Sequence, residues 1–250
     1  MITNPVSGTR VDEVAEGIYR ISTPMPTLPG GFSFNQYLLK DDAPLLFHSG
    51  PRGLFPLVSE AVAAVMPLET LRYVGLSHFE ADECGALNEF LAAAPGAVPV
   101  CSGIAAMVSV DDFATRKAWP LGDGEVLELG RHRVRWIDTP HVPHGWECGY
   151  LFEESTRTLL CGDLFTQGGA EHAPVTESDI LGPSEAMRAG LDYFAHGTGT
   201  RPSLERLAAL EPMTLACMHG SAWRGDGRGL LLALADSLEG SIRTPAGAGA

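Results

Sequence analysis

Four residues that can bind a metal ion lie within a stretch of six: His78, Glu80, Asp82 and Glu83. They follow the apolar run LRYVGL, which is typical of a buried strand. In an extended chain, residues two apart point the same way, so the first three side chains can converge on one point. This spacing indicates a metal site where the strand leaves its sheet. The alternative is a polar loop in which Asp82 and Glu83 stabilise a helix N-terminus.

Three later strand-like runs also lead into histidine or aspartate. His144 follows the run VRWID, Asp163 follows TLLCG, and His219 follows TLACM. Ligand sites in α/β proteins gather at the carboxyl ends of strands. Asp163 has two oxygens and could bridge a pair of ions, and a two-metal centre orients whatever binds between them.

The elements that must position these residues mix strands and helices along the chain. Strands are predicted near 17–23, 34–40 and 43–49, with a hairpin turn at Asp41-Asp42, and helices near 53–65, 83–94, 184–194, 203–210 and 229–238. Neither internal repeats nor a polar linker divide them. This pattern predicts one layered α/β domain over residues 1–243, with sheets inside and helices outside, followed by a disordered tail at 244–250.

Composition excludes several classes of function. The chain has 250 residues, with 17 basic and 31 acidic side chains and a net charge of −14, which disfavours binding to nucleic acid or anionic membranes. Five cysteines without a CxxC pair are typical of reduced cytosolic thiols. The start of the sequence does not have the pattern of a secretory signal, and no apolar run reaches spanning length, so we expect a cytoplasmic protein. Neither a Gly-x-Ser-x-Gly elbow nor a phosphate-binding loop is present.

Taken together, the ligand pattern resembles the flavodiiron branch of the metallo-β-lactamase superfamily. His-x-Glu-x-Asp at 78–82 is followed by His144, by Asp163 nineteen positions later, and by His219 before Gly-Ser-Ala-Trp-Arg. Most hydrolases of the superfamily carry His-x-His-x-Asp-His instead. The segments FNQYLL, GDLF and LDYF are similar to its opening strand, bridging-aspartate strand and late helix. The resemblance implies a four-layer αββα sandwich formed by two mixed sheets flanked by helices.

The same resemblance implies a non-haem diiron centre that binds or reduces dioxygen or nitric oxide. One iron would take His78, Glu80 and His144, the other would take Asp82 and His219, and Asp163 would bridge them. Glu80 favours iron because a carboxylate is a harder ligand than the imidazole it replaces. Zinc and manganese remain alternatives, since zinc also accepts histidine and carboxylate ligands.

The sequence departs from the family at two positions. Glu83 stands where the family has histidine, and it could bind the second metal, hydrogen-bond a neighbouring ligand, or merely occupy the first turn of a helix. His48 stands before Ser49-Gly50, where the superfamily usually has aspartate before Thr-Gly.

The family spacing favours His144 over His141 as the ligand. His141 would then line the pocket with Trp146 and Tyr193, although aromatic residues are more often plain core. Glu147 is the predicted outer hydrogen-bond partner of the His144 imidazole. His132, His172 and His196 are interpreted as surface histidines.

Three functions follow from this site. The leading one is binding or reduction of dioxygen or nitric oxide, with electrons from a separate flavoprotein or rubredoxin-like donor, because the resemblance implies a stand-alone branch with no flavin in this chain. The alternative is a hydrolase of an ester, lactone or phosphodiester with two zinc or manganese ions. The third is a non-catalytic sensor. A homodimer is compatible with the family.

Overall fold

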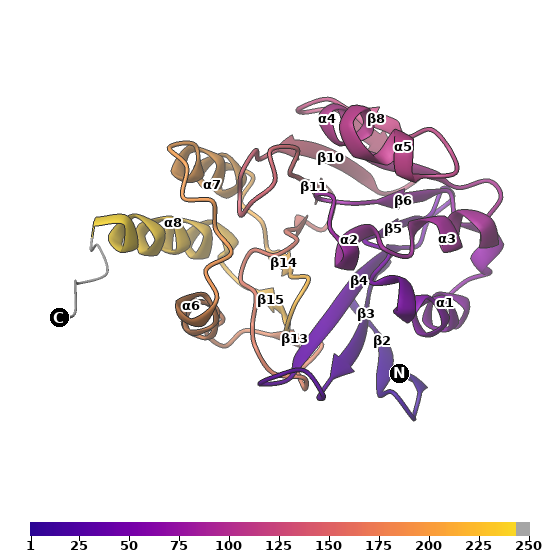
Figure 1. Cartoon of the computed structure of the whole chain (residues 1–250), viewed down its shortest axis with the longest axis horizontal. Coiled ribbons are helices and arrows are strands. Elements are labelled where there is room, and N and C mark those ends of the chain that lie inside the picture. Colours follow the sequence, from indigo (N-terminus) through magenta and orange to yellow (C-terminus); the bar gives the residue numbers. More distant parts are fainter. Residues whose placement is uncertain (244–250) are drawn as a thin grey trace.

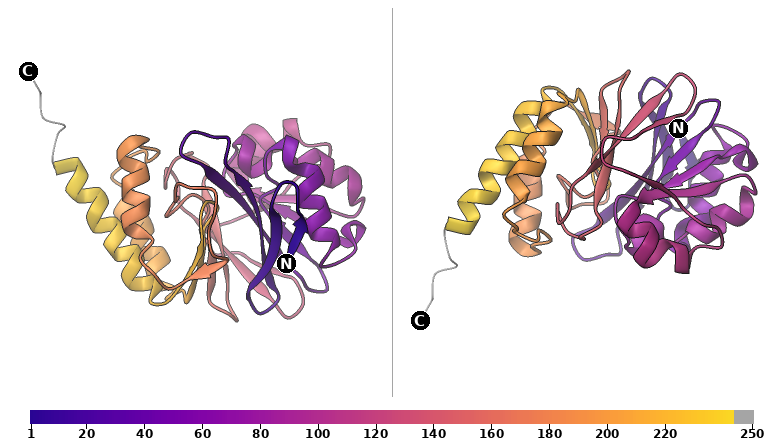
Figure 2. Two further views of the ribbon diagram at one scale, coloured as in Figure 1. Left: turned by 90° about the horizontal axis from the view of Figure 1, so that it is seen from below. Right: turned by 90° about the horizontal axis from the view of Figure 1, so that it is seen from above.

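Two mixed β-sheets pack face to face, and helices cover the outer face of each, in this computed structural model, which describes residues 1–243 (Figure 1, Figure 2). Both views in Figure 2 show helices at the two outer ends with the sheets between them. The predicted four-layer αββα sandwich is therefore confirmed. The predicted tail at 244–250 lies outside the described residues.

The first sheet holds its strands in sequence order. They are β1 (Ile2–Asn4), β2 (Thr9–Ala15), β3 (Ile18–Met25), β4 (Phe32–Leu39), β5 (Leu45–Phe47), β6 (Tyr73–Gly75), β7 (Val98–Ser102) and β8 (Trp119–Leu121). Neighbours are antiparallel up to β5 and parallel from β5 onward. The antiparallel register of Leu39 with Leu45 confirms the predicted hairpin.

The second sheet has the order β13-β15-β14-β12-β11-β10-β9. Its strands are β9 (Val126–Glu128), β10 (Arg133–Asp138), β11 (Gly149–Glu153), β12 (Thr158–Leu160), β13 (Val175–Thr176), β14 (Thr214–Ala216) and β15 (Ala222–Arg224). Strands β12 and β14 are parallel neighbours, so the residues that follow them leave the sheet side by side.

The helices form two outer layers. They are α1 (Phe55–Ala63), α2 (Ala81–Cys84), α3 (Leu87–Ala93), α4 (Gly103–Ala105), α5 (Asp111–Phe113), α6 (Leu181–Gly190), α7 (Thr200–Ala209) and α8 (Gly227–Arg243), with short turns η1 (Arg52–Leu54), η2 (Leu68–Thr70) and η3 (Ala106–Val110). The first group, up to α5, lies with the first sheet, and α6 to α8 lie with the second (Figure 1). Among the helices of residues 1–243, none combines the length and apolar character needed for a membrane span.

Two helices differ from their predictions. The helix predicted at 184–194 corresponds to α6, which ends at Gly190, so the segment LDYF with Tyr193 lies in the loop after it. The helix predicted at 83–94 is interrupted between α2 and α3. The backbone N–H of Ala86 donates to the carbonyl of Gly50 at 2.9 Å, so it is taken out of the helical hydrogen-bond ladder. The interruption lets α2 form a separate short turn beside the ligand-bearing loop.

The core between the sheets fixes how the two halves face each other. Tyr37 and Phe47 from the first sheet and Trp136 and Leu151 from the second belong to one buried apolar cluster. Burial of large apolar side chains is the main favourable contribution to folding. Packing between the sheets therefore brings strand ends from both halves to a common edge.

Candidate metal centre

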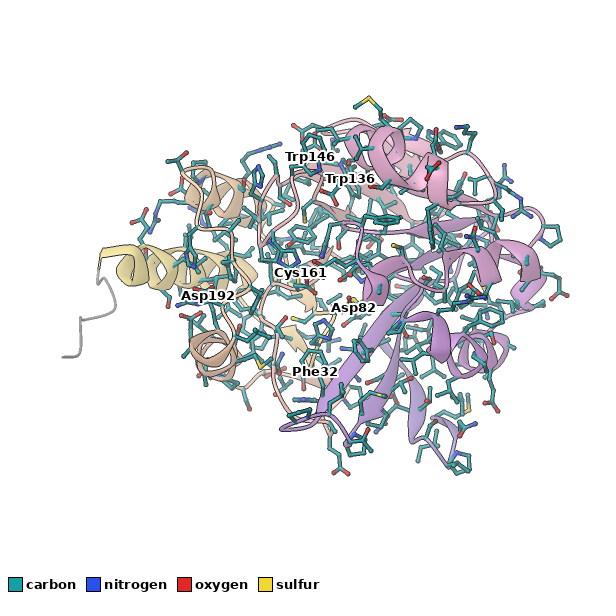
Figure 3. All side chains as sticks on the ribbon, in the orientation of Figure 1. Phe32, Asp82, Trp136, Trp146, Cys161 and Asp192 are labelled. Carbon is teal, nitrogen blue, oxygen red and sulfur yellow. The ribbon has the colours of Figure 1, made fainter. Side chains whose placement is uncertain are left out.

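The first group of predicted ligands follows β6 of the first sheet. His78 lies in the loop after this strand, Glu80 precedes α2 in an extended conformation, and Asp82 and Glu83 form the first turn of that helix. Acidic residues stabilise a first helical turn through the helix dipole. Asp82, which Figure 3 labels, lies close to His219, the residue that follows β14 of the second sheet.

The remaining ligands come from the second sheet. His144 lies in the loop between β10 and β11, Asp163 follows β12, and His219 follows β14. The backbone N–H of His141 donates to the carbonyl of Gly145 at 2.8 Å, which closes the turn that presents His144. The two sheets thus bring the seven predicted ligands together.

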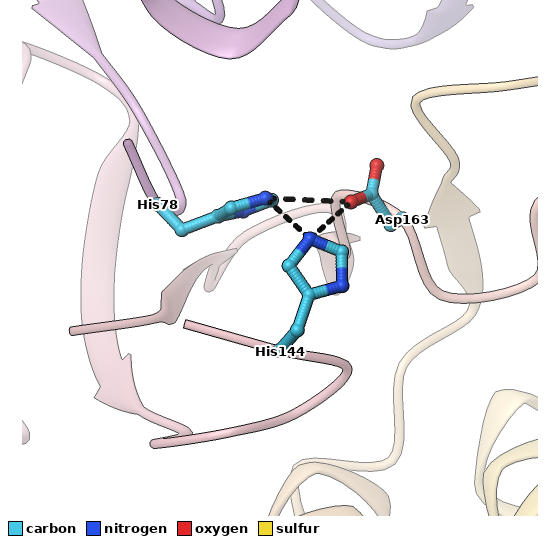
Figure 4. A group of neighbouring side chains, drawn as sticks. All are labelled: His78, His144 and Asp163. Atoms are coloured by element: carbon cyan, nitrogen blue, oxygen red, sulfur yellow. Dashed lines mark hydrogen bonds and ion pairs between the residues drawn. The ribbon is translucent and has the colours of Figure 1, made fainter. Parts of the chain in front are cut away.

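Two imidazoles and two carboxylates form one half of the cluster. The Nε2 atoms of His78 and His144 are 2.9 Å apart, and they lie 3.5 and 3.6 Å from Oδ2 of Asp163 (Figure 4). Oε1 of Glu80 is 3.1 Å from Nε2 of His144. We call the group of His78, Glu80 and His144 site 1.

The other half has a single imidazole. Nε2 of His219 lies 3.4 Å from Oδ2 of Asp82 and 3.3 Å from Oδ1 of Asp163. We call the pair of Asp82 and His219 site 2. Asp163 therefore directs one oxygen to each site, and Figure 4 shows its second oxygen turned away from site 1.

Glu83 lies between the two sites and is fully buried. Its Oε1 is 3.9 Å from Nε2 of His78. Neither of its oxygens accepts a hydrogen bond within the described part of the chain. Burial, followed by the charge of Asp163, raises the pKa of Glu83 well above its ordinary value. Glu83 does lie in the first turn of α2, and its burial leaves the other two predicted roles, metal binding and hydrogen bonding to a neighbouring ligand, as predictions.

The other carboxylates are stabilised as anions by the histidines. Contacts with His144 and His78 lower the pKa of Glu80 to about 2. Burial by itself would raise the pKa of Asp163, but His219, His78 and His144 hold it well below its ordinary range. Burial likewise opposes charge on His219, yet Asp163 and Asp82 raise its pKa to about 9. The cluster is therefore strongly coupled by charge.

Each of the three imidazoles predicted as ligands has an outer hydrogen-bond partner on Nδ1. The partners are the carbonyl of Tyr193 for His144 at 2.7 Å, the carbonyl of Ser33 for His219 at 2.8 Å, and the hydroxyl of Ser77 for His78 at 3.0 Å. The prediction that Glu147 is the outer partner of His144 is wrong. Oε1 of Glu147 instead accepts the backbone N–H of Phe79 at 3.0 Å. All three Nε2 atoms are left facing the centre.

The predicted pocket residues lie in different places. Tyr193 borders site 1, with its ring centroid 6.5 Å from that of His144. Trp146 is exposed and lines a separate cavity with Met107 and Pro140 on the far side of its loop. His141 is exposed, and its described contact with this loop is the backbone bond to Gly145.

One remote histidine also corrects the sequence interpretation. His132 is buried rather than on the surface, and its Nδ1 lies 3.1 Å from Oε1 of the fully buried Glu153. His172 and His196 are partly buried.

Sequence reasoning missed the residues that hold the His219 loop. Arg20 and Asn35 both donate to the carbonyl of Gly220, at 2.6 and 2.8 Å, and Ser33 Oγ accepts the Gly220 N–H at 3.0 Å. These side chains come from β3 and β4, in the opposite sheet. Polar residues at alternate positions of the otherwise apolar β4 were the available signal.

Comparison with known proteins gives relatives of one kind. The chain is 28% identical over 215 residues to the anaerobic nitric oxide reductase flavorubredoxin of Aeromonas hydrophila, covering 81% of this chain and 42% of that protein. It is 26% identical over 209 residues to the rubredoxin-oxygen oxidoreductase of Megalodesulfovibrio gigas, covering 79% and 50%. The chain thus spans half or less of the length of these curated relatives.

Solved structures show the same fold. The flavodiiron protein from Giardia intestinalis superposes with a TM-score of 0.79 at 20% identity, covering 93% of this chain and 60% of that chain. A fragment of diflavin flavoprotein A 5 from Nostoc sp. PCC 7120 superposes with a TM-score of 0.78 at 19% identity, covering 94% and 97%.

A family model gives the assignment. The model described as ODP family beta lactamase matches residues 32–220, which is most of the chain and includes every predicted ligand. The protein therefore belongs to the ODP family beta lactamase, in the flavodiiron branch of the metallo-β-lactamase superfamily.

Proposed function

We propose that the protein holds a non-haem diiron centre that binds or reduces dioxygen or nitric oxide, with electrons from a separate donor. Site 1 would hold one iron and site 2 the other, with Asp163 as the bridge and Glu83 as a further carboxylate ligand. We also propose that residues 1–243 form one metal-binding domain. When bound, two irons would supply sites at which a diatomic ligand can bind and accept electrons.

The observation that carries this proposal is the close approach of two imidazoles. Nε2 of His78 and Nε2 of His144 are 2.9 Å apart, while Nδ1 of His144 is bonded to a carbonyl, which can only accept. Nδ1 of His144 therefore carries the proton in the neutral ring, and its Nε2 presents a lone pair toward the other ring. Such an arrangement requires a proton or a metal ion between the rings.

The distances fit a shared ion. Bonds of about 2.0–2.1 Å would place two donor atoms about 3.0 Å apart at a right angle and about 3.4 Å apart at a tetrahedral angle. The donor pairs of site 1 are separated by 2.9 to 3.8 Å, and those of site 2 by 3.3 and 3.4 Å. Glu83 supports the same conclusion, because a buried carboxylate without a hydrogen bond is costly unless it is paired or binds a metal.

The donor set favours hard metals. Glu80, Asp82, Glu83 and Asp163 together would carry four negative charges, which match two divalent cations. Oxygen-rich sites suit iron or manganese better than they suit metals that prefer sulfur. The three imidazoles fix the remaining positions through the outer hydrogen bonds on their Nδ1 atoms.

The open side of the centre lies at Glu80. Its side chain is 51% exposed, against 1% for His78 and 9% for Asp163. Glu80 borders a cavity that is lined by Phe79, Cys84 and Phe113 among others. The ring centroids of Phe79 and Phe113 are 5.3 Å apart. The Arg52–Glu89 ion pair lies on the rim of the same cavity, and we propose that dioxygen or nitric oxide approaches along its aromatic wall.

The names of the relatives indicate the kind of electron donor. One relative is named a rubredoxin-oxygen oxidoreductase, and the name of the other, a flavorubredoxin, also contains rubredoxin. We propose that this chain receives electrons from a separate flavoprotein or rubredoxin-like protein. Dimer formation and a cytoplasmic location stay predictions.

Metal analysis and one optical experiment test this proposal. Protein from iron-supplemented cells should hold about two irons per chain, and the reduced protein should change its absorption on exposure to dioxygen or nitric oxide. The matched control is Asp163→Ala, which should lose both properties. Two zinc ions together with hydrolysis of esters, lactones or phosphodiesters would contradict the proposal and support the hydrolase alternative.

A further inference from the structure

The three ligand histidines differ in what fixes their protonated nitrogen. Nδ1 of His144 faces the carbonyl of Tyr193, and Nδ1 of His219 faces the carbonyl of Ser33. A carbonyl oxygen can only accept a hydrogen bond, so Nδ1 must carry the proton in both rings and Nε2 is free to bind a metal. For these two histidines the backbone alone determines the tautomer.

His78 is different because its partner can act either way. Its Nδ1 lies 3.0 Å from the Ser77 hydroxyl, which can donate or accept a hydrogen bond. If the hydroxyl donated to Nδ1, the proton of the neutral ring would sit on Nε2 and block the metal position. Another group must therefore fix the direction of the Ser77 hydroxyl.

That group is His48, at the end of β5. Its Nε2 lies 3.0 Å from Oγ of Ser77 and also accepts the backbone N–H of Ser77 at 3.3 Å. A backbone N–H can only donate, so Nε2 of His48 carries no proton. The Ser77 hydroxyl must then donate to the same nitrogen, and its lone pairs are left to accept the Nδ1–H of His78.

The surroundings keep His48 neutral and in place. Its side chain is 1% exposed and stacks on Phe47 with ring centroids 4.2 Å apart. The backbone N–H of His48 donates to the carbonyl of Gly75 at 2.8 Å. The backbone φ of His48 is 67°, which is unusual for a residue other than glycine. Burial lowers the pKa of His48 to about 3. Strain of this kind is typical of residues that serve a site.

We propose that His48 is a positioning residue that acts through Ser77 to keep the proton of His78 on Nδ1, so that Nε2 of His78 faces the metal. The inference deepens the proposed function, on which it rests for the identity of the site. It also gives the residue at position 48 a role, because the unprotonated Nε2 of an imidazole there is shared by the hydroxyl and the backbone N–H of Ser77.

Two substitutions of His48 distinguish its role as a hydrogen-bond acceptor from its role in packing against Phe47. His48→Gln places a carbonyl oxygen near the position of Nε2 but loses the aromatic ring, whereas His48→Phe keeps the stacking on Phe47 and loses the acceptor. Removing an outer partner of a ligand histidine typically weakens metal binding about 10- to 100-fold. We expect His48→Phe and Ser77→Ala to weaken metal binding at site 1 by this factor. The metal affinity of His48→Gln should remain within about threefold of that of the unaltered protein.

Two controls accompany these variants. Cys101→Ala removes a buried thiol of β7 from the core of the first sheet, and it is expected to leave metal affinity unchanged. His132→Phe alters a buried histidine that pairs with Glu153 away from the cluster, and it should change stability without changing metal affinity.

Nitrogen-15 NMR of the zinc-loaded and metal-free full chain gives a readout that does not depend on iron or activity. We expect the proton of His48 on Nδ1 in both forms and the proton of His78 on Nδ1 in the zinc form. A proton on Nε2 of His48, or weaker binding in His48→Gln than in His48→Phe, would overturn the inference. If the protein binds zinc but no iron, the diiron proposal fails while the tautomer result still decides the role of His48. If a variant does not fold, the tautomers of the unaltered protein decide it.

Discussion

Site 1 and site 2 share Asp163 but balance their charges in different ways. Site 1 sets two imidazoles against Glu80, whose side chain is half exposed. Site 2 has one imidazole against Asp82, and the buried Glu83, whose Oε1 lies 3.9 Å from Nε2 of His78, accepts no hydrogen bond in the described chain. Site 1 therefore has two imidazoles to balance its carboxylates before any metal arrives, whereas site 2 has one.

This difference assigns distinct roles to the two halves. Coupling between histidines and carboxylates can hold site 1 together in the metal-free protein, since contacts between opposite charges stabilise both ionised forms. Site 2 depends more on a cation, because a single imidazole, that of His219, faces both Asp82 and one oxygen of Asp163. We therefore expect metal loss to disturb site 2 more than site 1.

The largest effect should come from removing the residue that the two sites share. Asp163→Ala deletes both bridging oxygens, so both metals should bind more than about 100-fold more weakly, which exceeds the usual loss from removing an outer partner. Asp163→Asn keeps one carbonyl oxygen and is expected to lose one metal first. Metal analysis and calorimetric titration measure both. Two tightly bound ions in Asp163→Ala would show that the halves are independent.

Glu83 provides the next test, because stability and metal binding should change in opposite directions. Glu83→Met removes two buried oxygens that accept no hydrogen bond, so the metal-free protein should gain about 1–3 kcal/mol in free energy of unfolding. Binding of the second metal should weaken at the same time. Urea unfolding of the metal-free chain and a metal titration measure the two effects.

Glu83→Gln is the matched control for this test. It keeps the shape and the polar atoms but removes the charge, so it should weaken metal binding with a smaller gain in stability. A Glu83→Met variant that is less stable and binds two metals normally would show that Glu83 has a structural role and that the two sites do not differ as described.

Much of this centre was predictable from the sequence because its signals are local. The period of two in an extended segment brought His78, Glu80 and Asp82 together, and the strand ends indicated Asp163 and His219. The choice of His144 over His141 rested on the family spacing. The layered fold followed from alternating element types and from the resemblance.

Other features depend on contacts that leave no local signal. The partner of His144 is the carbonyl of Tyr193, and every residue carries a carbonyl, so side-chain chemistry led to Glu147 instead. The burial of Glu83 depends on where α2 lies, and that of His132 depends on its long-range pair with Glu153. Such contacts and burial can be predicted only when the packing of the two sheets against each other is known.

A smaller effect should follow from replacing an oxygen ligand of site 1 with a nitrogen ligand. Glu80→His replaces a hard oxygen donor with an imidazole, so the preference for zinc over iron should rise by about tenfold, or roughly 1.4 kcal/mol. Competition between zinc and iron followed by metal analysis measures the shift. Glu69→His, at an exposed position after α1, is the control. Unchanged iron loading in Glu80→His would contradict the role assigned to Glu80.

The smallest effect should appear as a pH dependence of the metal-free protein. The pKa of His219 is raised to about 9, above the ordinary 6.5 that applies in the unfolded chain. Its contribution to stability is therefore fully present below pH 6.5 and is lost as the pH rises through 9. His78 and His144 lie beside the same carboxylate and should compensate for part of the loss.

Thermal unfolding of the metal-free chain across this pH range measures the effect, and His219→Gln should flatten it. A bound metal would replace the proton as the counter-charge of Asp163 and Asp82, so the metal-loaded protein should show a weaker dependence. If both forms respond alike, the proton on His219 does not contribute to the stability of site 2. The two sites would then not differ in charge balance through the number of their imidazoles.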